Sequence, residues 1–421
     1  MKKLALAVLL SVLPLAAGSI ACRAADSAWI QAVANGFEAR LVSSAPVCPM
    51  LHTDKGDTAM SMRAAANTNF PLICAAALPA GVASASIAGT ELPLPVAEPQ
   101  RILVLGDTGC RIKGAALQAC NDPAKWPFPQ LAAAAARLKP DLVIHLGDYL
   151  YRESPCPAGD KGCAGSPWGD NWTAWQADFY TPAAPLLAAA PIVLVRGNHE
   201  DCLRAGPGWL RLQGPAANSE SCIPHLPVYS LDLGSVRLAV MDDATASDTD
   251  IVRPDNETYA AELAGLGAIP APVWFVHHRP IWGPVSGPLG IPIGGNLTLI
   301  DADRIAALRG DPPIAPNVEL MLSGHLHTFE AINYAKTVPP QIVAGNGGDD
   351  LLVTPKNLRG TQFQGHSGVT VADGLSVGGF GFLLMTRAEG GWTIDLYDSV
   401  GTRTRSCRFT EGKPGRLYCP V

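Results

Sequence analysis

Residues 142–151 read LVIHLGDYLY, an aliphatic run that ends in a Gly-Asp pair. Residues 101–109, RILVLGDTG, have the same pattern of an aliphatic run followed by Gly-Asp. In a third run, residues 192–200, IVLVRGNHE, the glycine is followed by Asn. Further along, residues 273–280 read VWFVHHRP and residues 318–327 read VELMLSGHLH. Each run predicts a strand followed by a side chain that can bind a metal. Because ligands in open α/β sheets bind outside the carboxyl ends of the strands, these blocks predict one metal site at a sheet edge.

Around these blocks, strand and helix patterns alternate. Helical patterns cover residues 128–138, 172–189, 256–266 and 301–308, the second broken by its prolines. Two hairpins are also expected, residues 229–233 with 236–242 and residues 379–386 with 392–398. Strands that alternate with helices predict an α/β layered structure, and the added hairpins make its sheets mixed. The segment Gly283–Gly295 is rich in Gly and Pro and predicts a long loop near the site.

The composition indicates a globular protein with a well-buried core. The chain has 421 residues, of which 48% are apolar and only 16% charged, with a formal net charge of −6. No basic stripe favours a nucleic-acid surface, so none is expected. Residues 26–98 lack strong helical periodicity and predict a small N-terminal region, irregular or β-rich. Residues 99–421 are expected to form the catalytic domain.

The first residues predict an export signal. Lys2 and Lys3 precede the apolar segment Leu4–Ala17, and small residues follow, so residues 1–25 are interpreted as a signal peptide. The apolar segment is short for a transmembrane helix, and no later run would span a membrane. The protein is therefore expected to be periplasmic or secreted. Two interpretations of Cys22 stay open: ordinary cleavage nearby, or lipidation that anchors the chain at Cys22.

The eleven cysteines agree with export. Without Cys22, the remaining ten cysteines form five pairs whose members are close in sequence. The simplest hypothesis pairs neighbours: Cys48–Cys74, Cys110–Cys120, Cys156–Cys163, Cys202–Cys222 and Cys407–Cys419. Such pairing would staple individual loops, as suits an extracytoplasmic chain.

The candidate ligands are oxygen and nitrogen donors without a thiolate. They are the carboxylates of Asp107 and Asp148, the amide of Asn198 and the imidazoles of His278, His325 and His327. This mixture favours iron, zinc or manganese. Asp148 could bridge two cations with its two oxygens. Two metals roughly 3.5–4 Å apart can hold the attacking and leaving oxygens of a displacement at phosphorus.

Taken together, the blocks resemble those of the calcineurin-like metallophosphoesterases and, more narrowly, the purple acid phosphatases. Most of that superfamily has Asp-x-His in the first block, whereas this chain has Asp107, Thr108 and Gly109. The purple acid phosphatase pattern instead has a tyrosine three residues after the bridging aspartate, which here is Tyr151. The resemblance covers residues 101–329.

This resemblance implies a metallophosphoesterase-like sandwich of two mixed β-sheets flanked by helices. It also implies an exported, acid-phosphatase-like hydrolase with two metal ions, in which a metal-bound hydroxide attacks a phosphomonoester. Metal 1, Fe(III), would be held by Asp107, Asp148, Tyr151 and His327. Metal 2, which would be Fe(II), zinc or manganese, would be held by Asp148, Asn198, His278 and His325.

The remaining site residues are assigned by position. His199 is the candidate that steadies a phosphate oxygen or protonates the leaving group, alongside Asp148 as catalytic residue. Asn198 and His277 are candidate substrate-binding residues, and the choice between His277 and His278 as ligand stays open, with the spacing favouring His278. Glu200 and Asp201 are expected to orient His199. A phosphodiesterase with the same metals, or a non-catalytic phosphate- or partner-binding surface protein, are the alternatives.

Overall fold

The structure is a computed structural model that describes residues 27–34, 36–216, 221–287, 291–310, 314–364 and 368–420. The expected signal peptide over residues 1–25 and Cys22 lie outside the described residues. Two large sheets dominate the molecule, one of 11 strands and one of 7. Both mix parallel and antiparallel pairs, which confirms the predicted mixed α/β class.

Each sheet places strands from distant parts of the sequence side by side. In spatial order, the first sheet consists of β26 (Arg416–Tyr418), β25 (Arg403–Thr410), β24 (Gly391–Asp398), β23 (Gly381–Ala388), β9 (Arg101–Leu105), β12 (Leu142–His145), β13 (Ile192–Leu194), β1 (Ser27–Val33), β2 (Gly36–Ser43), β6 (Leu72–Ala77) and β5 (Ser61–Ala64). The second sheet has the order β14 (Tyr229–Asp232), β15 (Arg237–Val240), β16 (Val273–Val276), β19 (Val318–Ser323), β21 (Gln341–Ala344), β20 (Phe329–Tyr334) and β22 (Val371–Val377).

The central strands are buried on both faces. In β9, Ile102 and Val104 join the core between the two sheets, while Leu103 and Leu105 pack in the core on the other side of their own sheet. In β16 of the second sheet, Trp274 likewise faces inward. Successive side chains of a strand point to opposite faces, so a strand covered on both sides must be apolar at every position. This is why these strands read as continuous aliphatic runs.

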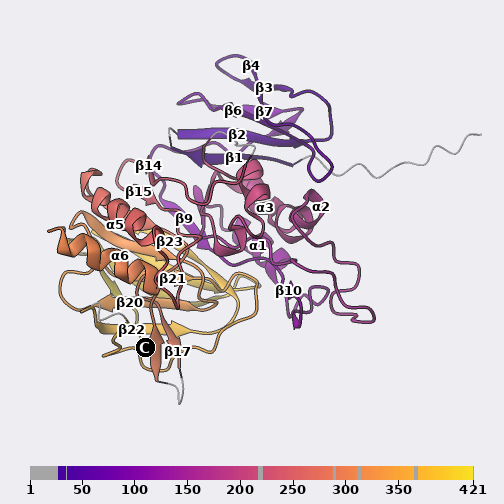
Figure 1. The fold of residues 1–421 in the computed structure, drawn as a ribbon. Coiled ribbons are helices and arrows are strands. Elements are labelled where there is room, and N and C mark those ends of the chain that lie inside the picture. Colours follow the sequence, from indigo (N-terminus) through magenta and orange to yellow (C-terminus); the bar gives the residue numbers. More distant parts are fainter. Residues whose placement is uncertain are drawn as a thin grey trace, which may run out of the picture.

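Helices cover the outer faces of both sheets. α1 (Phe128–Ala136) and α3 (Thr181–Ala189) share a core with the first sheet, and α5 (Asp255–Gly265) and α6 (Leu297–Leu308) share one with the second. Figure 1 shows α5 and α6 side by side across the second sheet. The resulting order of layers is helix, sheet, sheet, helix, the sandwich that the sequence resemblance implies. The other helical segments are α2 (Trp172–Trp175), a π-helical turn (Gln176–Tyr180), α4 (Gly206–Leu212) and 3-10 turns at Asn198–Glu200 and Leu266–Ala268.

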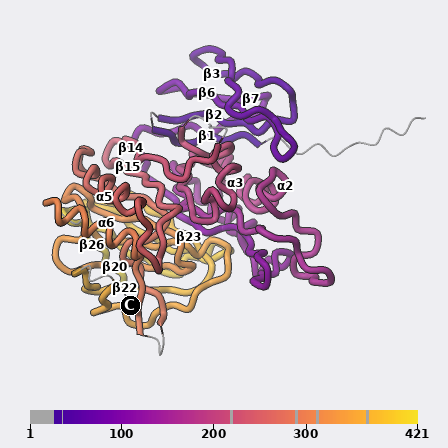
Figure 2. The backbone as a smooth tube through the Cα atoms, in the orientation of Figure 1, coloured from indigo at the N-terminus to yellow at the C-terminus, as the bar shows by residue number. Residues whose placement is uncertain are grey.

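The N-terminal strands extend the first sheet. β1 runs parallel to β13, with Gln31 opposite Ile192, and β2, β6 and β5 follow outward. A small sheet of β4 (Thr58–Ala59), β3 (Met50–Thr53), β7 (Ala85–Ile87) and β8 (Thr90–Glu91) packs on these strands through its own core. The indigo and violet segment at the top of Figure 2 is this region. The buried guanidinium of Arg40 ties it to the rest by donating to the carbonyls of Leu212 and Gly214.

Two local expectations were wrong. The segment Gly283–Gly295 contains a ribbon of β17 (Pro284–Ser286) and β18 (Pro292–Gly294) rather than only a loop. A strand with one unpaired side tolerates proline, so the Pro-rich composition hid a strand signal. The helical segment 172–189 was also expected to be broken by its prolines. Helical structure instead continues from Trp172 to Ala189, with Pro185 inside α3. One further short pair is β10 (Ile112–Lys113) with β11 (Ala116–Leu117).

The structure confirms the nearest-neighbour pairing of the cysteines. The five disulfides are Cys48–Cys74, Cys110–Cys120, Cys156–Cys163, Cys202–Cys222 and Cys407–Cys419. Each closes a short loop, as the sequence predicts. Over the described ranges, none of the helices has the length and apolar character needed to cross a membrane.

A buried acid in α6 makes the stability of the fold depend on pH. Asp303 is 4% exposed, and its Oδ1 has no hydrogen-bond partner among the described residues. Burial raises the pKa of Asp303 to about 7. An acid whose pKa is raised by folding stabilises the fold while it is protonated, and that contribution is lost as pH rises from about 4 through about 7.

We therefore expect Asp303→Asn to raise the thermal midpoint by several degrees relative to wild type at pH 8 and by clearly less at pH 5. Scanning calorimetry at both pH values measures this. The control is Asp122→Asn, at an exposed aspartate. Asp122 accepts a hydrogen bond from the N–H of Ala124, and an asparagine at this position can still accept it. Equal shifts at both pH values would contradict the assignment.

Candidate metal centre

The strands bring the candidate ligands to one edge of the sandwich. β9, β12 and β13 run parallel in the first sheet, and β16 and β19 run parallel in the second. Asp107, Asp148 and Asn198 follow the first three strands, and His278 and His325 follow the other two. Because the carboxyl ends of parallel strands meet at one edge, residues far apart in sequence become neighbours.

Three of these residues have left-handed backbone conformations. The φ angles are 57° at Asp107, 59° at Asp148 and 67° at His325. Such conformations cost about 1–3 kcal/mol each and persist where the surroundings enforce them. Backbone hydrogen bonds do so here: the N–H of Asp107 donates to Gly147, and the N–H of His325 donates to the Asp107 carboxylate at 2.9 Å. The turn after each strand thus aims its side chain into the site.

Tyr151 lies at the centre of a first donor cluster, which consists of Asp107, Asp148, Tyr151 and His327. Its Oη is 2.8 Å from Asp148 Oδ2, 3.2 Å from His327 Nε2 and 3.3 Å from Asp107 Oδ1. His327 Nδ1 donates to the carbonyl of Asp350 at 2.6 Å, which leaves Nε2 as the nitrogen that faces the cluster. Burial, with the charges of Asp148 and Asp107, raises the pKa of Tyr151 well above its ordinary value. A phenolate would need a cation beside it.

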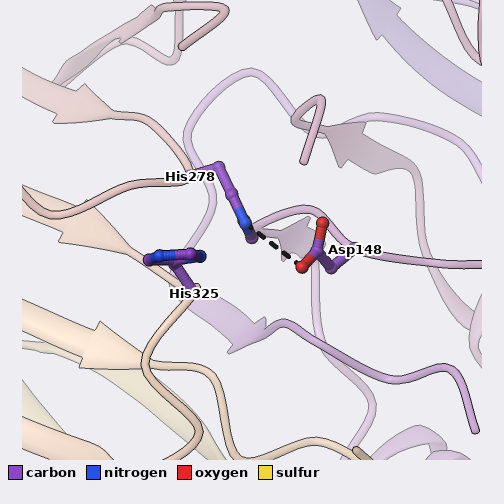
Figure 3. A group of neighbouring side chains, drawn as sticks. All are labelled: Asp148, His278 and His325. Carbon is purple, nitrogen blue, oxygen red and sulfur yellow. Dashed lines mark ion pairs between the residues drawn. The ribbon is translucent and has the colours of Figure 1, made fainter. Parts of the chain in front are cut away.

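A second donor cluster consists of Asp148, Asn198, His278 and His325. His278 Nδ1 donates to the carbonyl of Leu146 at 2.7 Å, and its Nε2 is 3.0 Å from Asn198 Oδ1 and 3.3 Å from Asp148 Oδ2. One ligand atom each of Asp148, His278 and His325 lies within 4.8 Å of the others. Figure 3 shows these three side chains pointing toward one another.

One oxygen of Asp148 serves both clusters. Oδ2 contacts Tyr151 Oη on one side and His278 Nε2 on the other, whereas Oδ1 accepts the backbone N–H of His199 at 2.8 Å. Bridging by Asp148 through both of its oxygens stays a prediction, and the contacts of Oδ2 place one oxygen next to donors of both clusters. A single shared oxygen brings the two clusters close together.

The structure separates the two adjacent histidines. The ring of His277 stacks on Phe275 at 4.4 Å, and its Nδ1 is 3.0 Å from Asp243 Oδ2. It is fully buried and belongs with the packing of the second sheet, so the structure does not bring His277 to the donor clusters as a substrate-binding residue. His278 points the other way, as the alternation of a strand end requires.

His199 lies against the first cluster. Its ring centroid is 3.7 Å from that of Tyr151, and its Nε2 is 3.9 Å from Asp148 Oδ2. Its Nδ1 is 2.8 Å from Glu153 Oε1 and 2.7 Å from Arg204 Nη2, and these two partners form an ion pair with each other. Burial lowers the pKa of His199 to about 3, against the opposing effect of Asp148. Glu153 and Arg204, rather than Glu200 and Asp201, therefore hold the ring.

Glu200 instead organises the turn that carries Asp148. Its Oε1 accepts the backbone N–H groups of Tyr149 and Leu150, and its Oε2 accepts those of Asp148 and Gly197. Burial and the charge of Asp148 raise the pKa of Glu200 to about 8, while its hydrogen bonds to Tyr149 and Leu150 lower it. Four donors aimed at two oxygens favour the ionised form.

Further carboxylates support the ligands from behind. Asp248 Oδ2 is 2.8 Å from His325 Nε2, and Asp349 Oδ2 is 3.5 Å from His327 Nδ1. Arg111 pairs with Asp349, and its Cζ lies 4.9 Å from the centre of the Tyr151 ring. Such outer partners fix the orientation of metal-binding imidazoles. No local motif marks Asp248 or Arg111 for this role.

The donor set fits two cations. Carboxylate, phenol, amide and imidazole donors suit iron, zinc or manganese. The charges of Asp148 and Asp107 raise the pKa of His278 to about 10, and those of Asp107 and Asp349 raise the pKa of His327 to about 9, in both cases against the effect of burial. The buried carboxylates around these histidines therefore favour positive charge in the pocket, and bound cations would supply it.

The comparisons with known proteins identify the family. A family model described as calcineurin-like phosphoesterase matches residues 100–329. The chain belongs to the calcineurin-like phosphoesterase family. Membership implies a metal-dependent phosphoester hydrolase with a dinuclear site. No curated protein sequence matches significantly.

Solved structures show the same fold. The purple acid phosphatase PPD1 from yellow lupin (Lupinus luteus) seeds is 14% identical, with a TM-score of 0.55, over 90% of this chain and 73% of that one. A structure of PhoD is 11% identical, with a TM-score of 0.52, over 93% of this chain and 91% of that one. At these low sequence identities, the similarity shows a shared fold alone.

Glu200→Gln tests the support of the Asp148 turn. The amide keeps only one acceptor oxygen, so backbone N–H groups now held by the other oxygen lose their acceptor, at about 1–3 kcal/mol each. We expect a lower thermal midpoint and a lower metal content per chain, measured by elemental analysis after dialysis. The control Glu330→Gln changes another buried glutamate, which Ser376 contacts in the second sheet, and should keep the wild-type metal content. Full loading of Glu200→Gln would show that the turn does not depend on Glu200.

Proposed function

We propose that this protein is an exported dinuclear-metal phosphatase, similar to acid phosphatases, that hydrolyses phosphomonoesters. The observation that carries the proposal is the convergence of two donor clusters on Asp148 Oδ2, with Tyr151 Oη on one side and His278 Nε2 on the other. Strongly perturbed pKa values cluster at functional sites, and Tyr151, His278 and His327 in these clusters have them. Family membership supports the same reaction class.

In this proposal the first cluster holds metal 1, which is Fe(III), and the second holds metal 2, which is Fe(II), zinc or manganese. The tyrosine supports a trivalent ion, because a phenolate is stabilised by high positive charge. The amide of Asn198 and two imidazoles favour a divalent ion in the second cluster. Bound there, the two cations would supply an activated nucleophile and neutralise charge on the phosphate.

The remaining residues orient the substrate and handle its charge. His199 lies beside the shared carboxylate with its ring held by Glu153 and Arg204. With Arg204 donating to Nδ1, the tautomer that carries its proton on Nε2 can donate a hydrogen bond to a phosphate oxygen or to the leaving oxygen. Asp148 fixes the spacing of the two clusters. A ring clamped from behind keeps its orientation during the reaction, which is the condition for effective transition-state stabilisation.

Export is supported by the sequence and by the disulfides. The charged and then apolar start of the chain fits a signal peptide. Five disulfides favour an oxidising compartment, the periplasm or the exterior. A lipid on Cys22 would anchor the exported protein to a membrane, and ordinary cleavage nearby would release it.

The function is tested by assaying metal-loaded protein on 4-nitrophenyl phosphate and on bis(4-nitrophenyl) phosphate at acidic and neutral pH. We expect faster monoester hydrolysis, and loss of nearly all turnover in Asn198→Ala because metal 2 loses a ligand. Asn357→Ala, at an exposed asparagine, is the control and should keep wild-type turnover. Diester preference would favour the phosphodiesterase alternative, and no turnover on either ester would favour a binding protein.

Colour tests the role of Tyr151. A tyrosinate bound to Fe(III) should give the iron-loaded protein a purple or pink absorption band, and Tyr151→Phe should abolish it. Tyr149→Phe is a matched control two residues away, because the Tyr149 hydroxyl donates to the carbonyl of Val195 and its ring stacks on His145. A band that survives in Tyr151→Phe would refute the phenolate ligand.

A further inference from the structure

A cleft opens beside the second donor cluster. Its volume is about 500 Å³, and it is lined by residues 201–203 and 244–249, with Pro224 and Arg279. Arg279 connects it to the site, because its Nη1 is 3.2 Å from His325 Nε2 and 2.7 Å from Asp248 Oδ2. A substrate whose phosphate lay between the clusters could extend its alcohol portion into this cleft.

Both walls of the cleft are held in place. The Cys202–Cys222 disulfide fixes one wall, where the N–H of Leu203 donates to Asp201 Oδ1 at 2.8 Å. The other wall is tied to the start of α6, where Asn296 Nδ2 donates to Asp248 Oδ1 at 2.8 Å. A pocket formed before the ligand arrives saves the cost of ordering loops on binding.

The charges of the cleft disfavour an anionic ligand. Asp248 and Arg279 form an ion pair, which leaves the carboxylate of Asp201 as the remaining charge among the lining residues. A second phosphate or a carboxylate in the alcohol portion, lying in the cleft away from the metal clusters, would meet net negative charge on the lining side chains. Phosphate esters of uncharged alcohols meet no such repulsion.

The cleft also offers apolar surface and few free hydroxyls. Leu203 is 96% exposed at its rim, and the exposed Pro224 also lines it. The hydroxyl of Thr245 is engaged, since it donates to Asp255 Oδ2 at 2.7 Å. A polyol would therefore find few partners here, whereas a hydrocarbon or aromatic ring would cover apolar surface.

We propose that this cleft is the leaving-group subsite and that it selects phosphate esters of uncharged, apolar alcohols, aryl alcohols among them. The inference rests on the proposed phosphatase function and extends it to a substrate class. Leu203 is a specificity-determining residue of this subsite, because it presents apolar surface to the leaving group from the rim. The ion pair of Arg279 and Asp248 marks the inner end of the cleft, next to His325.

The test compares binding of phenylphosphonate and methylphosphonate, which are not hydrolysed, to the metal-loaded protein by calorimetry. Both carry the same anionic head, so their affinity ratio reports the organic group. We expect phenylphosphonate to bind about tenfold more tightly to wild type, as burial of part of a ring would give. Leu203→Asn, which keeps size and adds no charge, should lose most of this preference. Leu308→Asn is the control, at a leucine 76% exposed at the far end of α6, and should keep it.

Turnover of phenyl phosphate against methyl phosphate is measured in parallel. A falling kcat/KM ratio in Leu203→Asn, with wild-type circular dichroism, supports the subsite. Equal binding of the two phosphonates by wild type, or an unchanged preference in Leu203→Asn, overturns the subsite while phosphatase activity stands. Absence of turnover on every ester overturns the proposed function itself.

Discussion

The centre depends on one carboxylate oxygen, Asp148 Oδ2, which faces both donor clusters. Its position requires a left-handed residue at the end of β12, and the structure secures that conformation from several sides. Glu200 accepts the N–H of Asp148, and Gly197 lies so close that a Cβ there would collide with the Asp148 backbone. Gly147, with a φ of 104°, completes the turn. Gly and Glu in these blocks therefore shape the backbone, while their neighbours supply the donors.

Neither sheet could form the centre alone. In the first cluster, His327 comes from the second sheet and its partners come from the first. In the second cluster, His278 and His325 follow strands of the second sheet, and Asn198 follows a strand of the first. The apolar core between the sheets thus sets the distance across the site. Because interiors pack at nearly crystalline density, that distance is fixed to within small shifts.

The sequence predicted the parts of the site that local pattern encodes. An aliphatic run, a glycine and a donor residue indicate a strand end, so the α/β class and the grouping of the candidate donors at one sheet edge could be predicted. Glu153 and Asp248 could not be predicted, because their importance lies in contacts with His199 and His325 that only the folded chain creates. The β17–β18 ribbon was not predicted, because prolines are typical of loops. They are also tolerated in a strand whose one side is unpaired. Long-range pairing of β1 with β13 likewise has no local signature.

The second nitrogen of each imidazole decides which histidines can be ligands. His278 Nδ1 donates to Leu146, and His327 Nδ1 donates to Asp350, so each presents Nε2 to its cluster. His325 Nε2 is engaged by Asp248, which leaves Nδ1 as its available nitrogen. His277 has the same kind of partner in Asp243, yet its ring lies on the packing side of the strand end. A histidine thus becomes a candidate ligand through two conditions together, an outer partner that fixes the tautomer and a strand end that turns the remaining nitrogen toward the shared carboxylate.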